Sequence, residues 1–107
     1  MGMTLWRTSC YESGTAAEEP IVNDSIILAI DQGTTGSTAV VVDFSGPESV
    51  VIGRSTVDFP QHYPKAGWVE HDLDEIWNSL SDATTQALNA AKRVNATFDP
   101  KRLTAIG

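Results

Sequence analysis

The chain has 107 residues, a formal net charge of −7 and a hydrophobic content of 41%, which together allow one globular domain at most. The acidic balance argues against a non-specific nucleic-acid binder, and no apolar run reaches the roughly 20 residues of a membrane span. A single cysteine, Cys10, excludes an intrachain disulfide framework, and without a signal-peptide core it favours a cytoplasmic location.

The first 24 residues show no sustained periodicity. Their middle part, from Ser9 to Pro20, is small, polar and acidic, which is typical of disordered segments. Its shortage of basic residues argues against a mitochondrial transit peptide. We therefore expect a disordered leader over residues 1–24 and an ordered part over residues 25–107.

The stretch Ile26–Val42 joins two apolar runs through a short polar turn. Ile26–Ile30 is continuous, aliphatic and rich in β-branched residues, which predicts a strand buried on both faces. Gln32–Gly36 has turn chemistry, and its two glycines can adopt backbone angles that are closed to other residues. Ser37–Asp43 returns as a second strand, so the sequence predicts a β-hairpin with a five-residue connection.

This turn concentrates groups that could bind an anion. Asp31, the hydroxyls of Thr34 and Thr35, and the glycines Gly33 and Gly36 fall within six residues. Successive backbone N–H groups in such a turn can form a concave nest, and the glycines let a phosphate approach the backbone. Asp31 could hold a hydrated Mg²⁺. The spacing excludes a Walker A loop, because no Lys follows the glycine, but it leaves a plain polar hairpin turn open beside phosphate binding.

A third strand and a long loop come next. Val50–Phe59 is predicted to be a strand, and Gly53 inside it suggests a bulge or the close approach of another backbone. Pro60–His71 has no helical or strand period. We expect the rings of Tyr63 and Trp68 to pin this loop to the fold. Its two histidines lack metal-ligand spacing and are expected to be solvated or hydrogen-bonded.

A helix is the clearest secondary-structure prediction. Asp72, followed three residues later by Glu75, matches a capping box, and this role explains the nearby acids better than a carboxylate site does. We expect Trp77 to anchor the helix in the core. One apolar stripe recurs at three- and four-residue steps: Leu73, Ile76, Trp77, Leu80, Ala83, Ala87, Leu88, Ala91 and Val94.

The last elements complete an α/β arrangement. Asp99 and Pro100 form a second cap or turn signal, and Leu103–Gly107 begins another apolar strand. A strand, helix, strand order favours a right-handed crossover that places the last strand parallel to one of the earlier three. The predicted architecture is a mixed β-β-β-α-β sheet with one helix on a face, which leaves the other face and an edge uncovered, as at the start of a larger domain.

Two segments carry a resemblance to a known family. IILAIDQGTTGSTAVVVD resembles the first hairpin of the FGGY carbohydrate kinases, whose fold is the ribonuclease-H-like or actin-like ATPase fold. FPQHYPKAGWVEHDLDEIW is similar to the glycerol kinase branch of that family. The resemblance runs from about Ile27 to Gly107. It implies that residues 25–107 are the first part of the family's N-terminal domain, in an N-terminal fragment of such a kinase.

The resemblance implies ATP-dependent phosphorylation of glycerol to sn-glycerol 3-phosphate with Mg²⁺. It places Asp31 near the metal and Thr34 near the transferred phosphoryl group and the product. The family's general base, adenine site and glycerol clamp would lie beyond Gly107, so no catalytic residue is expected here and the chain alone is predicted to be inactive. The resemblance also allows a homo-oligomer. The residues implied to contact the nucleotide are Gly33, Thr34, Thr35, Gly36 and Ser37.

Two departures and several alternatives accompany this resemblance. Gly36 stands where many relatives have Ser, and Thr38 stands where bacterial relatives often have Arg, which puts an ADP contact from that side chain in question. Another kinase of the family, acting on xylulose or gluconate, would keep the fold. An actin-like or chaperone ATPase would keep the hairpin and lack the GWVEHD segment. A catalytically silent fragment is the remaining alternative.

Overall fold

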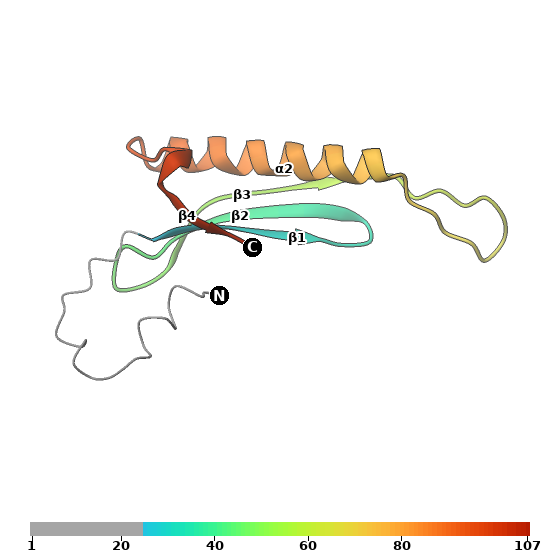
Figure 1. Ribbon diagram of the computed structural model, residues 1–107, viewed down its shortest axis with the longest axis horizontal. Coiled ribbons are helices and arrows are strands. Elements are labelled where there is room, and N and C mark those ends of the chain that lie inside the picture. The colour runs from blue at the N-terminus through green and yellow to red at the C-terminus, as the bar shows by residue number, and fades with distance from the viewer. Residues whose placement is uncertain (1–24) are drawn as a thin grey trace.

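The computed structural model describes residues 25–107 as a four-stranded sheet with one long helix across a single face (Figure 1). Strands β1 (Ile26–Gln32), β2 (Gly36–Asp43) and β3 (Val50–Asp58) form an antiparallel meander. Helix α2 (Leu73–Val94), the short 3-10 helix η2 (Pro100–Arg102) and strand β4 (Leu103–Ile106) follow. The strand order is β3-β2-β1-β4 and β4 runs parallel to β1, which confirms the predicted architecture. The expected leader and Cys10 lie outside the described residues.

The ends of the helix form largely as the sequence predicts. Asp72 is the N-cap, and its Oδ1 accepts hydrogen bonds from the N–H groups of Asp74 at 2.8 Å and Glu75 at 3.4 Å. Glu75 does not complete a reciprocal capping box, because its carboxylate bonds to His62 instead. Asp99 caps η2 in the same way, as expected. No helix within residues 25–107 combines the length and apolar character that a membrane span needs.

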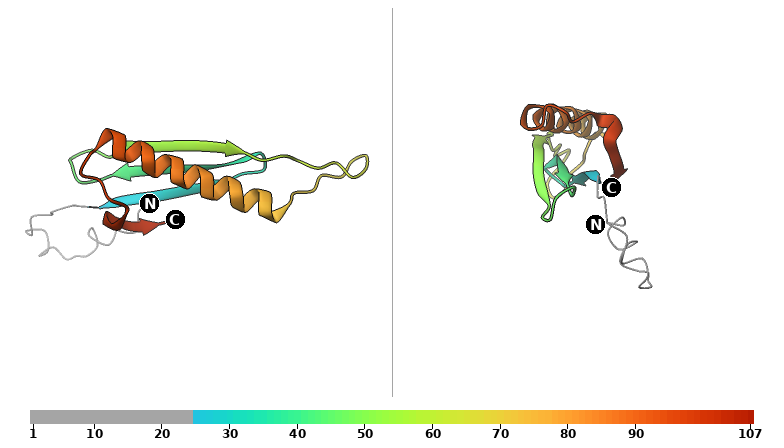
Figure 2. Two further views of the ribbon diagram at one scale, coloured as in Figure 1. Left: turned by 90° about the horizontal axis from the view of Figure 1, so that it is seen from above. Right: turned by 90° about the vertical axis from the view of Figure 1, so that its left-hand side faces the viewer.

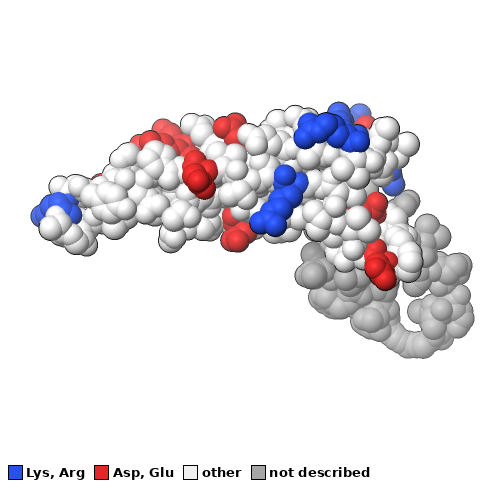
Figure 3. All heavy atoms as spheres, turned by 180° about the vertical axis from the view of Figure 1, so that it is seen from behind, with Lys and Arg blue, Asp and Glu red and all other residues white. Residues whose placement is uncertain are grey.

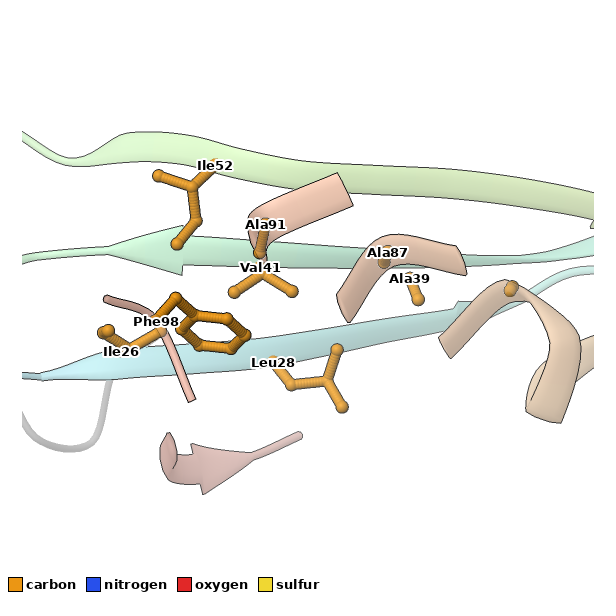
Figure 4. Close-up of a cluster of buried hydrophobic side chains, with 9 residues drawn as sticks. Ile26, Leu28, Ala39, Val41, Ile52, Ala87, Ala91 and Phe98 are labelled. Atoms are coloured by element: carbon orange, nitrogen blue, oxygen red, sulfur yellow. The ribbon is translucent and has the colours of Figure 1, made fainter. Parts of the chain in front are cut away.

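The core lies between α2 and the sheet (Figure 4). The strands contribute Ile26, Leu28, Val41 and Ile52, whereas the fully buried helix residues of the cluster are alanines, whose short side chains allow a close approach, and Leu88 of the helix packs against them. Phe98, in the connection after the helix, closes one end, although no sequence pattern singled it out. The opposite face of the sheet carries no helix among residues 25–107 (Figure 2), as predicted. The buried cluster comprises Ile26, Leu28, Ala39, Val41, Ile52, Ala83, Ala87, Ala91 and Phe98.

Gly53 is the point of closest contact between the sheet and the helix. A Cβ atom at this position would lie 2.2 Å from the carbonyl oxygen of Ala87 and 2.9 Å from the amide nitrogen of Ala91. The pairing of β2 with β3 also shifts register beside Gly53, between Val41 and Val42. The predicted bulge and the predicted close approach of another backbone are therefore both confirmed.

The prediction that Trp77 anchors the core is wrong. Its side chain is 65% exposed, and two further members of the expected stripe, Leu73 and Val94, are exposed as well. The face that packs on the sheet is made of small residues at four-residue intervals: Ser79, Ala83, Ala87 and Ala91. Ala83, Ala87 and Ala91 belong to the predicted stripe, so this part of the prediction is confirmed, whereas its bulky members Leu73, Trp77 and Val94 are exposed. The helix turns its small face inward because the sheet offers no depth above Gly53 for a large ring.

The loop between β3 and α2 is held by its main chain and not by its aromatic rings. Tyr63 is 69% exposed and Trp68 is 52% exposed, so the prediction that these rings pin the loop is wrong. Paired hydrogen bonds join the main chains of His62 and Glu70, with N···O distances of 2.9 and 2.7 Å. The Nζ atom of Lys65 lies 4.1 Å from the centre of the Trp68 ring, a cation–π contact within the loop.

Candidate phosphate-binding hairpin

The turn between β1 and β2 is tighter than the sequence suggested. Only residues 33–35 separate the two strands, and the N–H of Gly33 donates a hydrogen bond of 2.9 Å to the carbonyl oxygen of Gly36. Neither glycine uses the backbone angles closed to other residues. Among the described residues, the one glycine with a positive φ is Gly67, at 82°. The expectation of unusual angles at this turn is therefore wrong, and its glycines need another explanation.

Gly36 is required by the neighbouring strand. A Cβ atom there would lie 2.7 Å from Oδ1 of Asp58 and 2.8 Å from the carbonyl oxygen of Val57. The Asp58 side chain could rotate away, but the Val57 carbonyl belongs to the ladder that pairs β2 with β3. A serine at this position would therefore force β3 to shift. Gly33 faces no such restriction, because its nearest atom is the Gly36 carbonyl oxygen at 3.5 Å.

The tip of the hairpin presents unpaired donors to solvent. Thr34 and Thr35 are exposed, and neither their hydroxyls nor their main-chain N–H groups have a hydrogen-bond partner among residues 25–107. Four donors in two consecutive residues form a surface that suits the oxygens of a phosphate group. Gly33 adds none, since its N–H is used inside the turn.

Asp31 is the residue that could take part in binding a metal. It lies two residues before the tip on β1, is exposed, and its carboxylate has no partner among the described residues. Within residues 25–107 no group of three or more His, Cys, Asp or Glu side chains could hold a metal ion by itself. A single carboxylate suits Mg²⁺, which keeps several waters and shares its coordination with substrate phosphates.

The base of the hairpin is tied to β3 and α2, which holds the tip in place. The carbonyl oxygen of Thr35 accepts a 3.1 Å hydrogen bond from the N–H of Phe59. The fully buried hydroxyl of Ser37 lies 2.8 Å from that of Ser79, which itself donates to the carbonyl oxygen of Ile76. Ser37 must therefore be the donor to Ser79. Ser37 is fully buried and its strand pairs with β1 on one side and β3 on the other, so it presents no exposed group to a ligand.

The Ser37 to Ser79 hydrogen bond is expected to matter for stability. Ser79→Ala leaves the buried Ser37 hydroxyl without an acceptor, which should lower the free energy of unfolding by about 1–3 kcal/mol. Replacing both serines by alanine should cost less than the sum of the two single changes. Urea unfolding of the four variants measures this coupling. Ser81→Ala, at a partly exposed position of the same helix, is the control. If Ser79→Ala lowered the free energy of unfolding no more than this control does, the proposed hydrogen bond between Ser37 and Ser79 would be contradicted.

Thr38 and the two loop histidines complete the surroundings of the hairpin. The hydroxyl of Thr38 is bonded at 2.8 Å to that of Thr56 on β3. His71 lies edge-on to Phe59, with ring centres 5.2 Å apart. Phe59 follows β3 and bonds to Thr35, and His71 precedes the N-cap of α2, so this ring contact joins the end of β3 to the start of the helix. The Nε2 atom of His71 is buried and has no hydrogen-bond partner among residues 25–107, contrary to the prediction of a solvated or hydrogen-bonded ring.

His62 is hydrogen-bonded, as predicted. Its Nε2 atom lies 2.7 Å from Oε1 of Glu75 in the first turn of α2. This hydrogen bond and the negative charge of Glu75 raise the pKa of His62 above its usual 6.5, and Asp72 and Glu70 add to the effect. Because the folded-state pKa is raised, the contribution to stability is complete at pH below about 6.5 and disappears as the pH rises through the folded-state pKa.

The titration of His62 gives a direct check on this contact. We expect Glu75→Gln to lower the pKa of His62, because it removes both the charged acceptor and the nearest negative charge. Glu70→Gln should lower it less, since Glu70 acts only through its charge and makes the smallest contribution. The ¹H–¹⁵N or imidazole C–H resonances of His62, followed against pH, measure both shifts. Equal shifts in the two variants would show that the hydrogen bond is absent in solution.

The chain is similar to a described family and to several curated proteins. The model of the FGGY family of carbohydrate kinases, N-terminal domain, matches residues 26–107. The glycerol kinase of Rhodospirillum centenum is 48% identical over 81 residues, which cover 76% of this chain and 15% of that protein. The glycerol kinases of Thermococcus onnurineus and Enterococcus casseliflavus are 43% and 42% identical, over 78% and 76% of the chain. The chain thus spans about 15% of the length of these relatives.

Proposed function

This chain belongs to the FGGY family of carbohydrate kinases, and on that premise we propose that it supplies the phosphate-binding hairpin of an ATP-dependent kinase for glycerol. The observation that carries the proposal is the tip of the hairpin, where Thr34 and Thr35 present unpaired hydroxyl and N–H donors on a rigid base. The mixed sheet with its single helix is consistent with the N-terminal domain of the actin-like ATPase fold.

Phosphoryl transfer asks the protein mainly to position the reactants and to stabilise charge. In the proposed mechanism the donors of Thr34 and Thr35 bind oxygens of the ATP phosphates, with Thr34 next to the transferred group and the product. Preorganised donors of this kind act strongly because they need no rearrangement as charge develops. Gly33 and Gly36 contribute by shaping the turn. Ser37 acts as a positioning residue, since its hydroxyl fixes the hairpin to α2.

Asp31 is proposed to hold a hydrated Mg²⁺ near the same phosphates. Its exposed, unpaired carboxylate and its place beside the tip fit this role. When bound, Mg²⁺ supplies charge neutralisation for the phosphates and helps to orient them. Asp31 therefore contributes an anchor for the ion and leaves proton transfer to another group.

Glycerol is the proposed acceptor because the similar curated proteins are glycerol kinases. A kinase of the same family for another polyol or sugar is the alternative. The chain covers about 15% of those relatives, and we expect the general base and the glycerol clamp to lie outside residues 26–107. We therefore expect the purified 107-residue chain to show no glycerol phosphorylation, and measurable turnover by it would refute this. A cytoplasmic location and a homo-oligomeric assembly remain predictions.

A chimeric enzyme tests the proposal. Residues 26–107 replace the matching segment of the Rhodospirillum centenum glycerol kinase, to which this chain is 48% identical over 81 residues. We expect the chimera to phosphorylate glycerol with ATP and Mg²⁺, and to prefer glycerol over xylulose and gluconate. The unmodified relative is the control for expression and assay. A chimera that melts like the control and still binds glycerol, but has no ATP-dependent activity, would overturn the proposed role of the hairpin.

A further inference from the structure

A polar groove lies between β3 and the second half of α2. It has a volume of about 230 Å³ and is lined by Arg54, Ser55, Gln86, Asn89, Ala90 and Arg93. Because β3 is an edge strand, one side of the groove is open to solvent. Along the helix, Asn89 is ten residues beyond Ser79, which bonds to the base of the hairpin, so the groove lies ~15 Å farther along the helix axis. It is therefore separate from the candidate phosphate-binding hairpin.

The described residues that line the groove carry many hydrogen-bond donors, and none of them has a carboxylate. Arg54 and Arg93 are both exposed, and neither forms an ion pair within residues 25–107. The hydroxyl of Ser55 donates a 2.6 Å hydrogen bond to Oε1 of Gln86. This contact occupies the acceptor of the Gln86 amide and leaves its NH₂ group free to donate. Asn89 provides a second amide between Gln86 and Arg93.

The charge of the groove contrasts with that of the whole chain, which is −7. Figure 3, which looks at the side opposite to that of Figure 1, shows two groups of basic side chains on this side of the molecule, with acidic side chains around them and one beside the lower group. Such a local reversal of sign attracts anions in spite of the overall repulsion. Guanidinium groups also match the geometry of a phosphate oxygen pair, which a single ammonium group does not.

We propose that this groove binds a small phosphate group, with the guanidinium groups of Arg54 and Arg93 on two sides of it and the amides of Gln86 and Asn89 as further donors. The volume suits one phosphate with a short organic substituent better than a nucleotide, because pockets for drug-sized ligands start at about 300 Å³. The phosphate can be inorganic phosphate or the phosphate of a small monoester. Since the groove is exposed, the expected affinity is modest, with a Kd on the order of 1 mM.

The test is a titration of the ¹⁵N-labelled chain at constant ionic strength, with inorganic phosphate in one series and methyl phosphate in another. We expect shifts at the Nε–H groups of Arg54 and Arg93 and at the side-chain amides of Gln86 and Asn89. Shifts with either ligand support phosphate binding in the groove. Shifts with only one of them identify whether the groove takes inorganic phosphate or a phosphate monoester. Shifts confined to residues 33–36 would overturn the inference while supporting the separate hairpin site. Equal shifts in a chloride series would also overturn it.

Matched variants distinguish a built site from general charge attraction. Arg54→Gln and Arg93→Gln should each raise the Kd by about fivefold or more, because each removes a charge-assisted pair of hydrogen bonds. Lys92→Gln removes the same charge from an exposed neighbour that does not line the groove, so its effect should stay below about twofold. All three positions are exposed, which keeps the fold intact. A Lys92→Gln effect as large as that of Arg93→Gln would contradict a specific site.

Discussion

Replacing Thr34 and Thr35 together by valine in the chimeric kinase is expected to lower kcat for glycerol phosphorylation by about 100-fold or more. Valine keeps the shape and β-branching of threonine but removes both hydroxyl donors from the hairpin tip. Losing one preorganised donor to a developing negative charge costs on the order of 100- to 1,000-fold in other enzymes. Steady-state assays with ATP and glycerol measure the change, and ATP binding by calorimetry shows how much of it arises in the ground state.

The control for this double variant is Thr104→Val on β4. Thr104 is also exposed, but it lies away from the hairpin, so kcat should stay within about twofold. Since the side chains of Thr34 and Thr35 are exposed and their hydroxyls have no partners among residues 25–107, the melting temperature should not change. If the double variant kept both its ATP affinity and its glycerol phosphorylation, the tip would not be the phosphate site and the proposed function of this chain would fail.

Gly53→Ala is expected to produce the largest loss of stability of any single methyl added to this chain. The new Cβ would lie 2.2 Å from the Ala87 carbonyl oxygen, which is a main-chain atom inside a helix and cannot rotate away. Relief requires α2 to move off the sheet, and this opens the alanine-lined core. Overpacking costs about 1–3 kcal/mol when side chains can adjust, so ~3 kcal/mol or more is expected where only backbone can move.

Urea unfolding followed by circular dichroism measures this effect. Domains of this size have only about 5–10 kcal/mol of stability, so Gly53→Val should prevent folding altogether. Gly46→Ala is the matched control, because a Cβ there would meet nothing closer than 4.0 Å. That control should change stability by less than ~1 kcal/mol, and it can be stabilising because alanine restricts the unfolded chain. An unfolding midpoint for Gly53→Ala equal to that of the control would show that the helix sits farther from β3.

Several features of the fold were open to prediction from local patterns. The apolar run Ile26–Ile30, the turn signals and the period of the helix define the strands and α2 in their correct order. The prediction that this run is buried on both faces is wrong, because Ile26 and Leu28 are buried under the helix whereas Ala29 is exposed on the uncovered face. Asp72 and Asp99 mark the starts of α2 and η2, because a capping side chain needs only the N–H groups a few residues ahead. Gly53 marked a bulge and a close contact, although the sequence could not name Ala87 as the partner.

The errors share one cause, which is that a local pattern does not identify its partner surface. Trp77 belongs to a predicted stripe whose small members, Ala83, Ala87 and Ala91, do pack on the sheet, yet Trp77 itself is exposed. The choice depends on the depth available above the sheet, and that depth is set by Gly53 on β3, far from Trp77 in the sequence. Likewise Tyr63 and Trp68 are large enough to pin a loop, but both rings stay exposed and the loop is held by its main chain.

The sequence by itself determined the hairpin, the donors at its tip and the order of the elements, because turns, caps and periodicity depend on residues close together in the chain. Only the tertiary structure decided that the Ser37 hydroxyl bonds to Ser79, and that position 36 has no room for a Cβ atom beside the main chain of β3. It also brought Arg54 and Arg93 to one groove. These outcomes depend on distances between elements far apart in the sequence, and such distances are set by the packing of the helix on the sheet.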